Sequence, residues 1–427
     1  MTLVRARVMD TPDDPFAGGV LRHDEDAGLL VTDGVVRRRG PYESLRPAYP
    51  DEDVLDLRAG VLLPGFVDTH VHYPQVRVIG AIGQPLLHWL EHCALPEECR
   101  LADPSYAGEV ASEFVSGLVA AGTTSALVFG SHFPDAVDLL FEEVTRVGLR
   151  VTAGLVVSDR GLPEPLLTTP ERAYDESRDL AARWHGIGRT RYAVTPRFSY
   201  STTEATLDAC AAVLKDEPGT WFTSHVNENP DEVTAVSELF ADALHYVGTY
   251  DAHGLVGERT VLAHNVHPTD DELTMLAGRG AAVSHCPSSN SALGSGLFPF
   301  RRHVEHGVRV ALGSDVGAGT GFSLLKEGLQ ASFMQALLGP AGLPLTPAHL
   351  LFLATRAGAL ALGLDEVGDL GVGRAFDAAW LVPEPGDPLD IGLRHAASAE
   401  EALAKVFALG TTSDVAGVWV AGERIKG

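Results

Sequence analysis

Short apolar runs and longer amphipathic runs alternate along most of the chain. From about residue 61 onward, runs rich in Val, Leu and Ala are separated by segments with helical periodicity, such as SYAGEVASEFVSGLVAAG. The apolar runs predict buried strands, and the periodic segments predict helices that cover them. The strand candidates begin at Val61, Thr123, Leu149, Arg191, Trp221, Thr260, Ala281 and Val308. This alternation predicts an α/β fold with a (β/α)8 barrel of the TIM type over residues 61–372.

The two ends of the chain have a different pattern. Residues 1–60 contain short β-type runs, including GLLVTDGVVRRRG, which predicts a hairpin around Asp33-Gly34. Residues 373–427 again favour strands, in DAAWLVP and VAGVWVAGERIKG. Neither end carries enough apolar surface for a core of its own. We therefore expect residues 1–60 and 373–427 to pair into one small composite β-sandwich domain beside the barrel.

Composition narrows the class of protein further. A net charge of -25 over 427 residues argues against nucleic-acid and anionic-membrane partners, which require basic patches. No run approaches the ~20 apolar residues of a membrane span, and the first residues, MTLVRARVMD, lack the apolar run of a signal peptide. The 4 cysteines form no CxxC pair. We expect a cytoplasmic protein with reduced thiols.

Polar residues fall where the predicted barrel strands end, which is where catalytic groups of such barrels lie. These residues are His70, His72, Arg197, His225, Glu228, His264, His285 and Asp315, and the aromatic Phe198 follows Arg197. His70 and His72 are two residues apart, so both side chains can face the barrel interior. Together with His225 and Asp315, they would suit a borderline cation such as zinc. A single HxH among 17 histidines indicates little, but the coincidence at successive strand ends indicates a metal site.

The motifs at these strand ends resemble a known family. PGFVDTHVH is similar to the first metal motif of the amidohydrolase superfamily, and SHVNEN, LAHNVH, SHCPSSN and GSDVGAGTGFS follow in the order that this superfamily uses. More narrowly, THVHYPQ, LLHWL, TPRFS, SHVNENPDEV and SHCPSSNSAL together resemble the guanine deaminases. The resemblance covers nearly the whole chain and is densest from Pro64 to Ser323.

The resemblance implies one zinc ion per chain and a purine substrate. It places the metal on His70, His72, His225 and Asp315, with His264 nearer to the nucleophilic water than to the metal. Two-metal members use a carbamylated lysine on the fourth strand. Lysine occurs here only at positions 215, 326, 405 and 426, and the end of the fourth strand carries Arg197 instead. One metal is therefore expected, in a homodimer of the kind that the resemblance suggests.

The residues also suggest how a purine ring would be deaminated. Asp315 can take a proton from the attacking water, and Glu228, one helical turn after His225, can protonate the ring nitrogen beside the attacked carbon. A carboxylate that only favours a helix N-terminus is the alternative interpretation of Glu228. His264 completes the catalytic set.

Four further residues are expected to bind the base. Arg197 presents a rigid fork of donors that suits a ring carbonyl, and Gln75 offers both a donor and an acceptor. Phe198 and Trp89 can sandwich a planar ring, although LLHWL also fits an ordinary helix core. The segment from Tyr73 to Arg100 is long for a connection between a strand and a helix, and we expect it to form a lid.

Two alternatives to guanine deamination stay open. One is another aminohydrolase of the same subgroup, acting on a pterin, an oxidised guanine or a triazine. The other is a non-catalytic barrel that serves as a scaffold. Asn227 and the run Asn265-Val266-His267 depart from the pattern of the guanine deaminases. These positions are beside the expected ligands, so the departures put the substrate in doubt but not the metal site.

Overall fold

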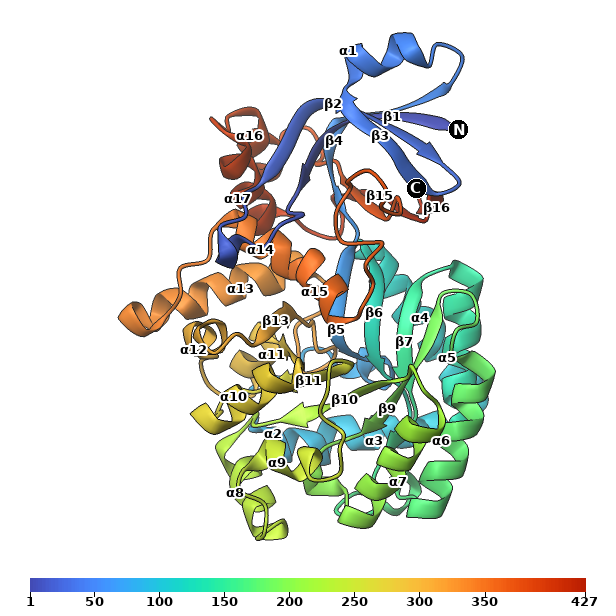
Figure 1. Ribbon diagram of the computed structural model, residues 1–427, viewed down its shortest axis with the longest axis vertical. Helices are drawn as coiled ribbons and strands as arrows, with labels where there is room; N and C mark the ends of the chain where they lie inside the picture. Colours follow the sequence, from blue (N-terminus) through green and yellow to red (C-terminus); the bar gives the residue numbers. More distant parts are fainter.

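The computed structural model describes residues 1–427, and its larger part is a parallel barrel surrounded by helices (Figure 1). Its strands, in spatial order, are β5 (Phe66–His72), β6 (Thr123–Phe129), β7 (Arg150–Gly154), β9 (Thr190–Pro196), β10 (Trp221–Val226), β11 (Thr260–His264), β12 (Ala282–His285) and β13 (Arg309–Leu312), with β8 (Val156–Val157) beside β9. The barrel closes where the chain that follows β13 forms hydrogen bonds with β5. The N–H of Asp315 donates to the carbonyl of His70, and that of His72 to the carbonyl of Val316, both at 2.9 Å. The expected (β/α)8 barrel is confirmed.

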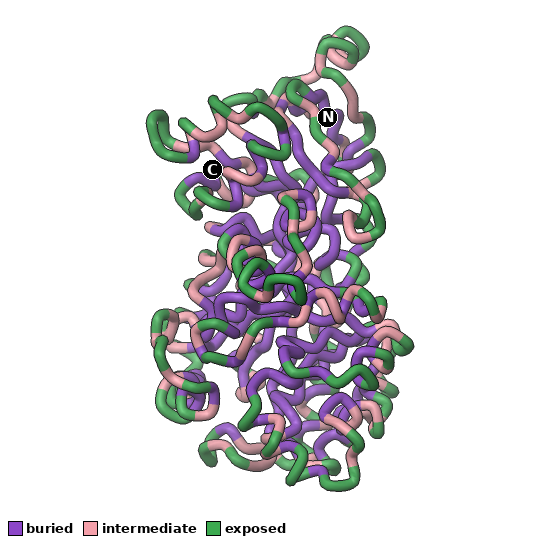
Figure 2. The backbone as a smooth tube through the Cα atoms, turned by 90° about the vertical axis from the view of Figure 1, so that its left-hand side faces the viewer, coloured by how far each residue is buried: buried purple, intermediate pink, exposed green.

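Amphipathic helices cover the outside of the barrel. They are α4 (Pro104–Ala120), α5 (Pro134–Val147), α6 (Pro170–Trp184), α7 (Glu204–Asp216), α8 (Pro230–Leu239), α9 (Tyr246–Asp251), α10 (Asp270–Arg279), α11 (Pro287–Ala292), α12 (Phe300–Glu305), α13 (Leu324–Leu337), α14 (Pro347–Ala354) and α15 (Arg356–Ala361). In α5, Val137, Leu140, Phe141 and Val144 recur at helical spacing and are buried. Figure 2 shows the result, with buried chain inside and exposed chain in the peripheral loops. None of the helices combines the length and apolar character that a membrane span requires.

The two chain ends form one seven-stranded sheet beside the barrel. Its order is β16 (Glu423–Lys426), β15 (Val415–Val420), β14 (Ala378–Leu381), β4 (Asp53–Pro64), β1 (Thr2–Asp10), β2 (Arg22–Thr32) and β3 (Val35–Pro41), with α1 (Tyr42–Leu45) after β3. The pairing of β4 with β14 joins the ends, which confirms the expected composite β domain. The predicted hairpin is also present, because Asp33 and Gly34 connect β2 to β3 with φ of 50° and 73°. The boundaries proposed at residues 60 and 373 stay a prediction.

Two features of the chain ends differ from the sequence analysis. The apolar run from Val61 does not form one strand: Val61–Pro64 pairs with β14, and the barrel strand begins only at Phe66. Gly65 lies between the two strands. Only glycine fits at this position, because a Cβ there would lie 2.2 Å from the Thr124 hydroxyl. In addition, two helices, α16 (Pro388–Arg394) and α17 (Ala399–Leu409), lie between β14 and β15, and α17 packs against α13 and α14 of the barrel.

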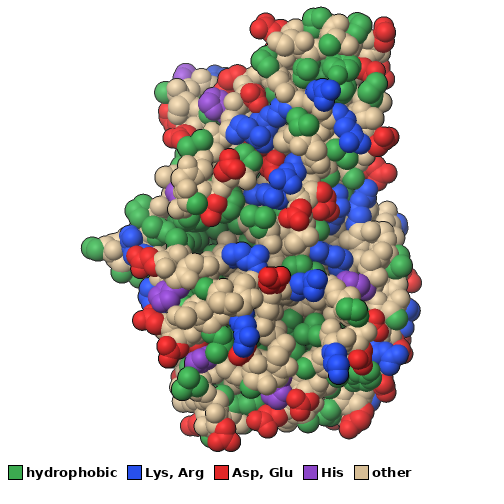
Figure 3. All heavy atoms as spheres, viewed as in Figure 1, with side chains coloured by type: hydrophobic (Ala, Val, Ile, Leu, Met, Phe, Trp, Pro, Cys, Tyr) green, Lys and Arg blue, Asp and Glu red, His purple; other side chains and the backbone are tan.

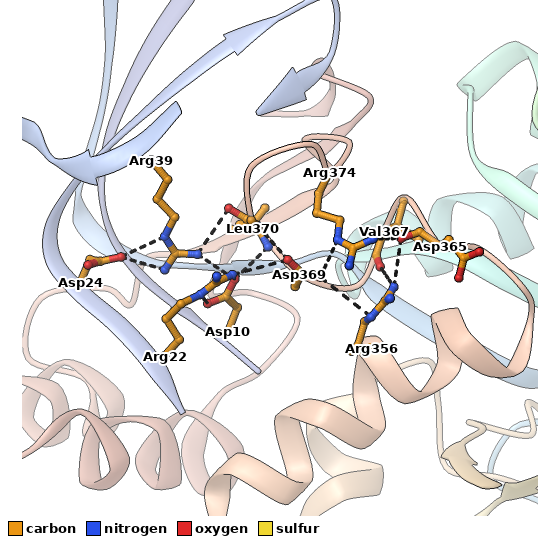
Figure 4. A network of polar contacts seen from close by, with 11 residues as sticks. Asp10, Arg22, Asp24, Arg39, Arg356, Asp365, Val367, Asp369, Leu370 and Arg374 are labelled. Carbon is orange, nitrogen blue, oxygen red and sulfur yellow. Dashed lines mark hydrogen bonds and ion pairs between the residues drawn. The ribbon is translucent and has the colours of Figure 1, made fainter. Parts of the chain in front are cut away.

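Ion pairs of two buried carboxylates, Asp10 and Asp369, link the sheet to the barrel, because Arg22 of β2 contacts both of them (Figure 4). Asp10, at the end of β1, is fully buried and accepts from Arg22 and Arg39. Asp369, in the loop that follows α15, pairs with Arg374 at 2.9 Å. Arg356 of α15 donates to the carbonyl of Val367 at 2.8 Å in the same loop. In Figure 3, Lys and Arg side chains gather across the middle of the face shown, where the two domains meet. Some of the arginines of this protein therefore form contacts at the junction between the two domains.

Candidate active site

Three histidines and one aspartate converge at the mouth of the barrel. His70 and His72 lie on one side of β5, and the Nε2 atom of each is 3.3 Å from Asp315 Oδ1. His225, near the end of β10, approaches the same point, with its Nε2 atom 3.1 Å from that of His72. All four side chains are buried. The structure therefore brings together the four residues that the sequence analysis expected to bind a metal.

The chemistry of these donors fits a metal cation. Burial lowers the pKa of His70 to about 3, so this ring is neutral, and neither of its nitrogens has a hydrogen-bond partner. His225 uses Nδ1 to donate to the carbonyl of Arg197 at 2.6 Å, which leaves the lone pair of Nε2 facing His72. The neutral rings of His70 and His225 and the carboxylate of Asp315 therefore present electron pairs to one point. No hydrogen-bond donor of the protein lies at that point to pair with them. A divalent cation such as zinc supplies what this arrangement needs.

Glu228 and His264 lie beside this donor set. Glu228 Oε2 is 3.4 Å from His264 Nε2, and the hydroxyl of Ser295 is 3.5 Å from Glu228 Oε1. His264 donates through Nδ1 to the side-chain oxygen of Asn290 at 3.0 Å, so its Nε2 faces the cavity with a lone pair. Burial, together with the negative charge of Asp315, raises the pKa of Glu228 well above its ordinary value. This environment favours the protonated form of Glu228, which is the form that can donate a proton.

The position of Glu228 corrects one step of the sequence analysis. The expected helical turn between His225 and Glu228 is wrong, because His225 lies in β10 and Glu228 in the loop before α8. Asn229 caps that helix and forms a capping box with Glu232. Glu232 also accepts from the backbone N–H of Glu228 at 3.0 Å. The loop is thus fixed by the helix that follows it, and the Glu228 side chain remains directed to the cavity.

The backbone at the barrel mouth is strained at two functional positions. His264 and Asp315 have φ of 72° and 48°, in the left-handed region that side chains other than Gly and Asn rarely adopt. Such a conformation costs about 1–3 kcal/mol and persists where the surroundings enforce it, as at many active sites. Here the strand-to-loop turns after β11 and before α13 orient the two side chains inward.

The cavity above these residues has one polar and one apolar wall. It is lined by His72, Gln75, Leu86, Trp89, Leu90, Arg197, Phe198, His225, Glu228, His264, Leu293, Asp315 and Ala318. All four residues expected to bind the base are in this set. Trp89 is 2% exposed, and its indole N–H has no partner within the protein. The cavity suits a small planar molecule with polar groups on one edge.

Much of the apolar wall comes from the segment that was expected to form a lid. Between Tyr73 and Arg100 the chain forms short helices, α2 (Leu86–Trp89), a π-helical turn (Leu90–Ala94) and α3 (Leu95–Cys99). Leu86, Trp89 and Leu90 project from them into the cavity and form a separate apolar cluster with Phe198 and Leu293. The segment therefore covers the barrel mouth with ordered structure.

The sequence analysis did not identify two residues beside the cavity, Glu98 and His132. It also included His285 among the residues at the barrel mouth, although His285 does not line the cavity. Glu98 of α3 accepts from Arg197 at 2.6 Å, and His132, after β6, lies 3.4 Å from Glu98. His132 follows a predicted strand and was detectable by the same rule as the other histidines, whereas no motif marked Glu98. His285, at the end of β12, does not line the cavity: its ring stacks on Phe298 at 4.2 Å.

Known proteins with this architecture identify the class. The model of the amidohydrolase family matches residues 61–425. A relative from Deinococcus radiodurans, described as a probable guanine deaminase, is 57% identical over 99% of this chain and 98% of its own length. The guanine deaminase of Escherichia coli K12 is 40% identical over 89% of this chain and 85% of its length. The solved structure of an E. coli guanine deaminase superposes with a TM-score of 0.95 at 35% identity, over 99% of both chains. The chain belongs to the amidohydrolase family.

Proposed function

We propose that this amidohydrolase catalyses the hydrolytic deamination of guanine to xanthine and ammonia. The observation that carries the proposal is that one cavity holds members of the His and Asp donor set, Glu228 with its raised pKa and the guanidinium of Arg197. The 57% identical relative described as a probable guanine deaminase supports the same reaction. Deamination at C2 needs an attacking water, a proton for the ring and a group that recognises the C6 carbonyl, and the cavity offers a residue for each.

We further propose that one zinc ion per chain is held by His70, His72, His225 and Asp315. The neutral rings, the unpartnered nitrogens of His70 and the adjacent carboxylate support this assignment. When bound, zinc supplies a water molecule that loses a proton near neutral pH. The tautomer of His225 is set by the carbonyl of Arg197, so this ring is prepared as a ligand before any metal arrives.

The carboxyl groups of Asp315 and Glu228 are assigned different proton transfers in this reaction. Burial opposes the charge of Asp315, but the close contacts with His70 and His72, each at 3.3 Å, outweigh it and hold the pKa of Asp315 well below its ordinary value. Asp315 is therefore the base that accepts a proton from the attacking water. Glu228 is the acid that protonates the ring nitrogen beside C2. His264 lies between the two carboxyl groups, where its Nε2 lone pair can orient the water. Asp315 then returns the proton that it took from the water to the amino group, Glu228 accepts the proton of the new hydroxyl at C2, and ammonia leaves as the C2 carbonyl forms.

Arg197, Gln75, Phe198 and Trp89 are proposed to bind the base. Arg197 has donors only, so it favours a carbonyl edge over an amino edge. Phe198 and Trp89 belong to the apolar wall and suit the faces of a planar ring.

The experiment that tests the proposed function is a panel assay for ammonia release from purified, metal-replete protein. Guanine, adenine, a pterin, an oxidised guanine and a triazine cover the alternatives, and guanine is expected to react fastest. Faster ammonia release from a pterin or a triazine than from guanine would identify the protein as another aminohydrolase of the same subgroup. Release from none of them would favour a scaffold.

We also propose that the protein acts as a homodimer in the cytoplasm. The family resemblance supports the dimer. All four cysteines, Cys93, Cys99, Cys210 and Cys286, are free thiols, which suits a reducing compartment. Sedimentation equilibrium of the purified protein tests the dimer directly.

A further inference from the structure

A buried glutamate contacts both polar side chains that are proposed to bind the base. Glu98 lies in α3 of the covering segment, is 3% exposed and is not among the residues that line the cavity. Its Oε2 atom accepts a hydrogen bond from Nη1 of Arg197 at 2.6 Å. Its Oε1 atom accepts one from Nε2 of Gln75 at 2.7 Å. Each carboxylate oxygen thus holds one of the two polar residues of the cavity wall.

These contacts fix which way the Gln75 amide faces. Its Nε2 atom donates to Glu98, and its Oε1 atom accepts from the backbone N–H of Gly317 at 3.1 Å. An amide that is held at both ends has one orientation, so its donor and acceptor cannot exchange places. The donor left on Nε2 is therefore presented in a defined direction.

The orientation of Arg197 also depends on Glu98. Both side chains of this pair are 3% exposed. Burial opposes the charge of Glu98, but the Arg197 guanidinium outweighs it and holds the pKa of Glu98 well below its ordinary value. The other near neighbour, His132, is 3.4 Å from Glu98 and also buried. A guanidinium with one nitrogen bound to a fixed carboxylate has a fixed plane, which leaves its other donors aimed at one place.

We propose that Glu98 is a positioning residue for substrate selectivity, because it aims Arg197 and Gln75 at the carbonyl edge of a purine without touching the base. This inference rests on the proposed function and extends it. Gln75 follows β5, Arg197 follows β9 and Glu98 belongs to the covering segment. The geometry that recognises the carbonyl therefore requires α3 to be packed over the barrel mouth, because α3 carries Glu98.

Equilibrium binding of two purines that carry no C2 amino group tests this role apart from catalysis. Hypoxanthine has the C6 carbonyl, and unsubstituted purine lacks it. Calorimetry on the metal-replete wild-type protein is expected to show tighter binding of hypoxanthine. Glu98→Gln is expected to weaken the binding of hypoxanthine by about 10- to 10²-fold, the contribution of one well-aimed hydrogen bond to a charged group. Purine should bind nearly as before, because its contacts are with the apolar wall.

The control is Glu97→Gln, the same change on the neighbouring residue. Glu97 bonds to Arg100 and Tyr106 and makes no contact with Arg197 or Gln75, so this variant should retain both affinities. Glu98→Asp keeps the charge but draws the oxygens back by one methylene. It should lose the same preference for hypoxanthine, and it carries the test if Glu98→Gln does not fold.

Unchanged affinity for hypoxanthine in both Glu98 variants, equal weakening of both purines, or no preference in the wild type would overturn the inference. Metal content, measured on each variant, should stay at the wild-type value. The outcome is separable from the proposed function. A wild-type protein that releases no ammonia from guanine would refute the deamination, while a selective loss of hypoxanthine binding would still establish the role of Glu98.

Discussion

The pKa values of two carboxyl groups in the candidate active site are shifted in opposite directions because their neighbours differ. Asp315 faces two imidazole rings, and its pKa is held low. Glu228 faces Asp315 and Ser295 in a buried setting, and its pKa is raised well above its ordinary value. Environments that push two pKa values apart separate an acid from a base. This division assigns the roles of Asp315 and Glu228 in the proposed reaction.

The first prediction at this scale concerns Glu228→Gln. The amide has nearly the same shape, but it cannot deliver the carboxyl proton to the ring. The variant is expected to retain metal and bind guanine while kcat falls by at least ~10²-fold. Steady-state kinetics with metal analysis checks this, and Glu238→Gln, an exposed change on α8, is the control. Near wild-type turnover in a metal-replete Glu228→Gln protein would remove the proton-transfer role.

The second prediction concerns Arg197. Arg197→Ala leaves Glu98 as an unpaired buried charge, which costs about 3–5 kcal/mol of folding free energy, so Arg197→Lys is the more informative variant. Lysine keeps the charge but cannot form the fork. The value of kcat/KM for guanine is expected to fall by about 10²-fold with metal content unchanged. If Arg197→Lys deaminates guanine as the wild type does, Arg197 does not bind the carbonyl.

At the scale of elements, the barrel strands could be predicted because each one is a short apolar run, and several of these runs have polar residues at or just beyond their ends. His70, His72, His225, His264 and Asp315 were found by that rule. Glu98 was not, because its role depends on where α3 is placed over the mouth, and no local pattern encodes that placement. The helices α16 and α17 were missed for a related reason: strand-like runs on both sides dominated the pattern of residues 373–427.

A third prediction links α13 to the barrel through a buried acid. Glu327 of α13 accepts from the N–H and the hydroxyl of Ser288 at 2.9 and 2.6 Å, and burial raises its pKa to about 8. The folded state therefore retains a proton that the unfolded chain, with an ordinary pKa near 4.5, has lost. The stability that this proton confers is fully present below about pH 4.5 and is lost as pH rises through about 8.

Glu327→Gln removes this titration. Between pH 5 and 8 the free energy of unfolding of the wild type is expected to decline relative to that of the variant, by up to about 1.4 kcal/mol per pH unit. Urea denaturation at several pH values measures both slopes. Parallel profiles for the two proteins would show that Glu327 is already ionised in the folded state.

At the scale of the whole molecule, the barrel and the composite sheet form one body through a shared junction. Asp10 and Asp369 form ion pairs with four arginines, and Arg22 of β2 links the two groups because it contacts both carboxylates (Figure 4). The backbone N–H of Leu370 also donates to Asp10. None of these residues lines the cavity, so the junction connects the two domains without supplying residues to the candidate active site.

Metal removal provides a prediction for the assembled protein. A chelator is expected to abolish guanine deamination and to lower Tm, because a ligand that binds only the folded state stabilises it. Addition of zinc should restore both, with saturation at one equivalent per chain. A stoichiometry of two, or full activity after complete removal of metal, would contradict the proposed single site on His70, His72, His225 and Asp315.

The most direct test of the central claim is product formation from guanine by the purified, zinc-loaded wild-type protein. Ammonia and xanthine are measured together, with adenine as the comparison substrate. The account predicts one ammonia and one xanthine for each guanine consumed. It predicts turnover of adenine at least ~10⁴-fold less efficient, since Arg197 finds no carbonyl there. Comparable turnover of adenine, or guanine left intact by a metal-replete protein, would contradict the claim.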